Sequence, residues 1–231
     1  MKKIKYFILL ILLAVVLASC TPTNNPEQEN TTPEYNEEGD PYPNRNPNGD
    51  KYEKGHLAYN LLNDEDGAYY EVTGIGDIKS KDVVIPNTYR GHPVKAIADS
   101  AFLECETMET ISIPTSITTI GWFAFYKCVN LKEVHVPNSV EVICSYAFYY
   151  CTSLETVTLP DNLLSFGTRC FYNCHNLTSL IIPLSVHWVG ESAVGKCYKI
   201  TVYCEAPSKP SYWHRSWNRD RRPVEWGYTE K

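Results

Sequence analysis

Apolar positions in the middle of the chain recur at a fixed step of 23 residues. Three such columns are Ile97, Ile120, Ile143, Phe166 and Val189; Met108, Leu131, Leu154, Leu177 and Ile200; and Cys105, Cys128, Cys151, Cys174 and Cys197. Each unit opens on a stretch such as residues 110–114, in which β-branched apolar residues alternate with polar ones. Alternation with a period of two predicts a short, half-buried strand, and the proline that follows ends it.

The remainder of each unit shows no helical period of useful length. We therefore expect the chain to return through short strands, turns and at most one 3₁₀ turn. A unit of 23 residues cannot enclose a core alone, so the pattern predicts a solenoid of five stacked units over residues 82–200. The first unit carries five extra residues, which we place at 89–93.

The repeated unit also resembles a known family. Its pattern, Ile-Pro-x-x-Val-x-x-Ile-Gly-x-x-Ala-Phe-x-x-Cys-x-x-Leu, is similar to the BspA-like leucine-rich repeat of bacterial surface proteins. The resemblance implies a right-handed, strand-rich leucine-rich-repeat solenoid, of the α/β class but with little helix. It also implies an N-terminal hairpin cap at residues 55–81 and a C-terminal aromatic cap at 201–231. For some family members it implies adhesion to host matrix proteins or to other cells.

Some repeats depart from this pattern. Ala98 and Cys144 stand in the column of Gly121, Gly167 and Gly190, Cys170 replaces an alanine and Val194 replaces a phenylalanine. These changes affect individual units and leave the repeat itself intact.

The N-terminus has the features of a secretory signal. Three lysines precede an apolar run of about a dozen residues, which is too short to span a bilayer as a helix. Leu17-Ala18-Ser19-Cys20 then resembles the bacterial lipobox. We interpret residues 1–19 as a signal peptide and expect Cys20 to carry a lipid, so that the secreted protein is anchored to the outer membrane or the cell surface.

The segment that follows is polar and rich in proline. Residues 21–54 contain six prolines and seven asparagines, with eight acidic residues against three basic ones. Such a composition cannot bury enough apolar surface to offset the entropy of ordering, so residues 20–54 are predicted to be a lipidated, disordered tether. Loss of three lysines with the signal would change the formal net charge from −6 to −9, which argues against a nucleic-acid partner.

Nine cysteines and six histidines show no pattern of a catalytic or metal site. Five cysteines form one repeat column, where neighbouring side chains point the same way, which is poor geometry for a disulfide. Buried free thiols are therefore the favoured interpretation, with at least one bridge as the alternative. No pair of histidines has metal-binding spacing and no nucleophile or phosphate-loop motif occurs, so we expect neither an enzyme nor a cofactor.

Two surfaces are candidates for binding. The outward side of the predicted strands carries a polar strip made of Thr110, Ser112, Glu133, His135, Thr156, Thr158 and Ser179. The alternative is an aromatic patch made of Tyr212, Trp213, Trp217 and Trp226. As a recognition face the strip favours a protein-binding or adhesion module with a host-matrix or cell-surface partner; the alternative is that it is merely a solvated face. The aromatic patch would favour an envelope protein that binds glycan, although aromatics there could equally close the end of the core.

Overall fold

A computed structural model describes residues 56–229. The described residues fold into a right-handed solenoid built from short strands and turns, without an α-helix or a 3₁₀ helix. The return path of each repeat consists of turns and two-residue strands, as the sequence predicted. Within this range no helix could cross a membrane.

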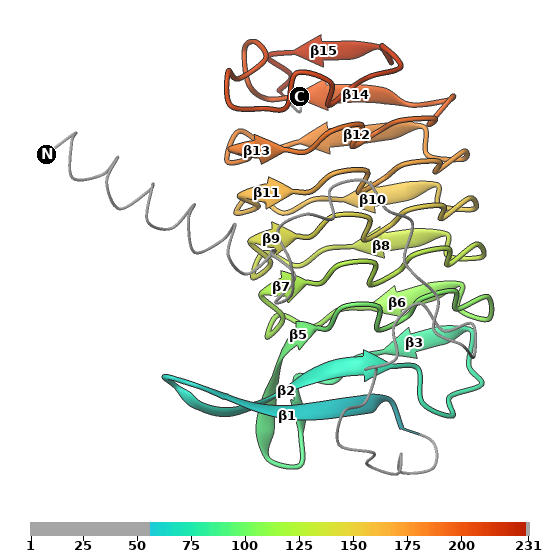
Figure 1. Cartoon of the computed structure of the whole chain (residues 1–231), viewed down its shortest axis with the longest axis vertical. Coiled ribbons are helices and arrows are strands. Elements are labelled where there is room, and N and C mark those ends of the chain that lie inside the picture. The colour runs from blue at the N-terminus through green and yellow to red at the C-terminus, as the bar shows by residue number, and fades with distance from the viewer. Residues whose placement is uncertain (1–55, 230–231) are drawn as a thin grey trace, which may run out of the picture. The chain divides into compact units, whose positions relative to one another are not determined.

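Fifteen strands define the solenoid (Figure 1). They are β1 (Ala58–Asp64), β2 (Gly67–Gly74), β3 (Asp82–Val84), β4 (Thr88–Tyr89), β5 (His92–Ile97), β6 (Thr110–Ser112), β7 (Thr119–Ile120), β8 (Glu133–His135), β9 (Val142–Ile143), β10 (Thr156–Thr158), β11 (Ser165–Phe166), β12 (Ser179–Ile182), β13 (Trp188–Val189), β14 (Thr201–Cys204) and β15 (Val224–Trp226).

The repeats stack through parallel ladders on two faces. One ladder has the order β3, β6, β8, β10, and it is followed by a separate ladder of β12, β14 and β15; we call this side the strand face. The other runs from β2 through β5, β7, β9 and β11 to β13. Equivalent residues 23 apart pair directly, as Thr119 does with Val142 and Glu133 with Thr156. The period predicted from the sequence is thus the period of the structure.

The third side of each repeat, which we call the turn face, is held by an unusual backbone. Two residues per repeat have positive φ although they are not glycine, as shown by Phe123 (55°) and Lys127 (54°) or Tyr146 (60°) and Tyr150 (63°). This conformation costs about 1–2 kcal/mol per residue. It turns each of these backbone N–H groups toward the next repeat, where Phe123 donates to the Ser145 carbonyl and Lys127 to the Tyr149 carbonyl. Hydrogen bonds between repeats therefore offset the local strain.

The core is a stack of similar layers, one from each repeat. Phe102, Phe125, Phe148 and Phe171 lie parallel, with ring centroids 5.0–5.4 Å apart and interplanar angles of 4–8°. All four side chains are buried.

Cysteine fills a neighbouring column for a specific reason. Four of the five thiols in this column donate to the phenylalanine carbonyl of the preceding repeat, for example Cys151 Sγ to Phe125 O at 3.1 Å and Cys174 Sγ to Phe148 O at 3.2 Å. Cys105, in the first repeat, contacts the Thr107 hydroxyl instead. The five thiols of the column are free and buried. Burial raises the pKa of Cys151 and of Cys174 far above the usual range, which keeps both thiols protonated.

Both ends of the stack differ from the repeats. At the first repeat β1 and β2 form an antiparallel hairpin, and β2 continues in parallel with β5. The five extra residues form a second small hairpin, in which β4 and β5 meet at Arg90–Gly91. Both of those residues have positive φ, as a tight two-residue turn requires. At the other end β15 adds to β14.

Candidate functional site

The strand face presents two columns of outward side chains in register. Thr110 pairs with Glu133, and Glu133 with Thr156, while His135 pairs with Thr158. Strand alternation sends Ile111, Val134 and Val157 into the core and leaves Glu133, His135, Thr156 and Thr158 exposed. The structure thereby brings together the central part of the predicted strip.

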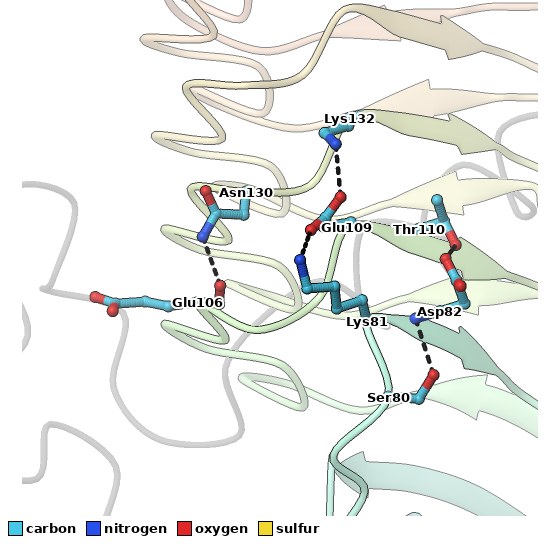
Figure 2. Close-up of polar contacts among 8 residues, drawn as sticks. All are labelled: Ser80, Lys81, Asp82, Glu106, Glu109, Thr110, Asn130 and Lys132. Atoms are coloured by element: carbon cyan, nitrogen blue, oxygen red, sulfur yellow. Dashed lines mark hydrogen bonds and ion pairs between the residues drawn. The ribbon is translucent and has the colours of Figure 1, made fainter.

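The ends of the strip are less uniform. Thr110 is only partly exposed, and its hydroxyl donates to Asp82 Oδ1 at 2.7 Å (Figure 2). Ser112 is exposed beside Val84 of β3. Ser179 is exposed too, but it lies on β12, which ladders with β14 and not with β10. Only the part of the strip on β6, β8 and β10 therefore lies on one hydrogen-bonded sheet.

One contact links adjacent repeats within the strip. His135 Nδ1 lies 3.1 Å from Thr158 Oγ1. This contact orients the imidazole along the solenoid axis, while both side chains stay accessible to solvent. A preorganised imidazole next to a carboxylate and hydroxyls can hydrogen-bond a polar partner with little loss of side-chain entropy.

A row of alternating charges borders this strip, and the sequence analysis missed it. The carboxylate of Glu109 lies between the ammonium groups of Lys81 and Lys132, each 2.5 Å away (Figure 2). The two lysines, Lys132 foremost, lower the pKa of Glu109 to about 2. The sequence does contain this pattern. The residue directly before each of β3, β6, β8 and β10 alternates in charge, as Lys81, Glu109, Lys132 and Glu155 in successive repeats. Because of the five extra residues, Lys81 does not lie 23 residues before Glu109, so the 23-residue period does not reveal it.

The C-terminal aromatic residues are mostly inside the molecule. Trp213 and Trp217 are only 3% and 4% exposed, and their rings meet edge to face at 5.2 Å. Trp213 Nε1 donates to the Val186 carbonyl at 3.2 Å. Trp226 is partly buried against the same cluster, and only Tyr212 is largely exposed. This burial contradicts an open sugar-binding platform on Trp213 and Trp217, because a sugar can stack only on a ring face that is accessible to solvent.

The described residues include neither the predicted lipid anchor nor a candidate metal site. Cys20, like the signal peptide and the tether, lies outside the described residues. Among residues 56–229, no group of three or more histidine, cysteine, aspartate or glutamate side chains could hold a metal ion.

Comparisons with known proteins agree with this architecture. The BspA-type leucine-rich repeat region matches in six copies over residues 77–204, which extends past both ends of the predicted range. A leucine-rich repeat protein from T. pallidum is 29% identical, with a TM-score of 0.60 over 67% of this chain and 71% of that one. A Bacteroides ovatus leucine-rich repeat protein is 26% identical, with a TM-score of 0.59 over 71% of this chain and 42% of that one. No curated protein matches the sequence.

The matched repeats cover more than half of the chain, and their columns are the ones that build the observed ladders and core. The protein therefore belongs to the BspA-type leucine-rich repeat family.

Proposed function

We propose that this protein is a cell-surface lipoprotein that binds another protein through the strand face, as an adhesion or interaction module. The observation that carries the proposal is the register of Glu133, His135, Thr156 and Thr158, which aligns four exposed polar side chains on one rigid sheet. Repeat proteins commonly use an extended face of the stack for binding.

The chemistry of the strip favours a protein partner. Short hydroxyl side chains leave the surface flat, and the imidazole and carboxylate give it hydrogen-bonding and charge specificity. Strands about 4.8 Å apart give a face only some 20–25 Å long over five repeats. That length fits a small interface of the weak, transient class, so adhesion would depend on many copies acting together.

The binding test replaces Glu133, His135 and Thr158 together with alanine. Binding to immobilised host-matrix proteins or to cells should be lost, because these side chains supply the specific contacts. The melting temperature should change little, since all three side chains face solvent. A matched control variant has alanine at Thr115, Asn138 and Glu141, which are exposed but lie outside the strand face, and it should bind normally. Normal adhesion by the strip variant would overturn the proposal.

The surface location is tested separately at Cys20. The lipobox-like sequence predicts that its thiol carries the membrane anchor. A Cys20→Ala variant should therefore remain unprocessed or leave the detergent phase, whereas a Cys204→Ala variant should partition like the wild-type protein. Normal maturation and detergent partitioning of Cys20→Ala would rule out the lipid anchor and leave the strand-face proposal standing.

A further inference from the structure

The turn face carries a continuous stack of tyrosine rings. Tyr126, Tyr149 and Tyr172 come from three successive repeats and lie almost parallel, with centroids 5.1 and 5.2 Å apart and interplanar angles of 7° and 2°. The next repeat has Gly195 in this column, and a Cβ atom there would collide with the Tyr172 ring. The last ring of the stack thus lies directly over the glycine.

Cations complete this surface at its C-terminal half. The Arg169 guanidinium lies 5.7 Å from the centroid of Tyr172, and Lys196 Nζ lies 5.5 Å from the same centroid. Arg222 lies 5.3 Å from the centroid of Tyr198, a ring that is 61% exposed. We call Tyr149, Arg169, Tyr172, Lys196, Tyr198 and Arg222 the cationic tyrosine ridge.

The three cations of the ridge form no ion pair with an acidic side chain of the described residues, and the nearby Asp220 carboxylate accepts from the Lys196 backbone N–H. Among residues 56–229, none of the five ion pairs found involves Arg169, Lys196 or Arg222. Residues 190–229 as a whole contain seven lysines and arginines against four acidic residues, in a chain whose formal charge is −6. This end of the molecule is therefore a local basic region.

The orientation of the tyrosine rings adds to the positive character of the ridge. An aromatic ring has a negative face and a positive edge. In the stack, neighbouring rings and cations cover the ring faces, so a ligand would meet the ring edges and the phenol hydroxyls, of which the Tyr172 hydroxyl contacts the Lys196 ammonium. Burial, together with the neighbouring Tyr172, raises the pKa of Tyr149, so its hydroxyl keeps its proton and can donate. Ring edges, hydroxyl donors and cations all favour an anionic ligand.

The spacing of the stacked tyrosine rings indicates which kind of anionic ligand would fit. Side chains on one side of an extended peptide recur about every 6.6–6.8 Å. This spacing does not match the stacked tyrosine rings, whose centroids are 5.1–5.2 Å apart. A linear polysaccharide repeats at about the length of one sugar ring and carries several hydroxyl acceptors per repeat. We propose that the cationic tyrosine ridge binds an acidic polysaccharide, whose carboxylate or sulfate groups contact Arg169, Lys196 and Arg222 and whose hydroxyls contact the tyrosine phenols.

Titration calorimetry of the whole protein with a heparin decasaccharide tests this proposal. Replacing Arg169, Lys196 and Arg222 with glutamine should weaken binding at least about tenfold, the equivalent of one charge-assisted hydrogen bond. A control variant with glutamine at Lys79, Lys81 and Lys132 loses the same charge elsewhere and should bind within about twofold of the wild type. A neutral cello-oligosaccharide should not bind.

A second variant separates the ridge from general charge and from folding. Tyr149→Phe with Tyr172→Phe keeps both rings and removes only the hydroxyls, so its melting temperature should match the wild type while affinity falls about threefold or more. Three results would each overturn the proposal: no heparin binding, equal losses in the ridge and control variants, or binding of polyglutamate as tight as that of heparin. The last result would assign the ridge to acidic proteins.

Discussion

Replacing Phe148 with alanine should destabilise the protein by about 3–5 kcal/mol, the usual cost of truncating a buried phenylalanine. Its ring is 0% exposed and stacks between Phe125 and Phe171 at 5.0 and 5.4 Å. A cavity in the middle of the stack cannot be filled from either side, because each neighbouring ring is held by its own repeat. Such a loss is a large part of the total stability of a small domain.

Thermal and urea unfolding followed by circular dichroism would measure this loss. Glu141→Ala in the same repeat is the control, because Glu141 is exposed and should shift the free energy of unfolding by no more than about 0.5 kcal/mol. If the two variants unfolded at similar temperatures, the assignment of Phe148 to the core would be wrong.

The Gly190→Ala variant should also be strongly destabilised, by about 1–3 kcal/mol or more. A Cβ atom at this position would lie on the backbone of Gly167 and Thr168 in the preceding repeat, closer than non-bonded atoms can approach. Backbone cannot move aside as a flexible side chain can, and Gly190 N also donates to the Phe166 carbonyl at 3.0 Å. The added methyl group would have to push two repeats apart.

Gly74→Ala is the matched control for this experiment. A Cβ atom at Gly74 would find its nearest neighbours at 3.5–4.0 Å, which is ordinary van der Waals contact. Its free energy of unfolding should therefore stay close to that of the wild type. A Gly190→Ala protein as stable as Gly74→Ala would show that the repeats are packed less closely than described.

The polar strip shows where sequence reasoning succeeds. In a strand the side chains alternate between the two faces, so the burial of Val134 and Val157 follows from their spacing, and so does the exposure of Glu133, His135 and Thr158. The cysteine column was likewise predictable as buried. Its use as a row of thiol donors to phenylalanine carbonyls was not, because that depends on where the backbone of the preceding repeat leaves an acceptor.

The C-terminal aromatics show the opposite case. Four aromatic residues beside several arginines are compatible with an exposed patch and equally with a closed core. Composition does not distinguish the two, since no repeat or period sets the direction of those side chains. The structure decides it by burying Trp213 and Trp217 against the last repeat.

The 23-residue period alone was enough to predict the solenoid, its strand register and most of its core, because stacked units place equivalent residues directly beside one another. The turn face was decided only by the tertiary structure. Its path needs bulky residues such as Phe123 and Tyr146 at positive φ, which local preference disfavours. Hydrogen bonds from one repeat to the next stabilise that backbone, and they exist only once the repeats are stacked. The alignment of the tyrosine rings is a consequence of the same stacking.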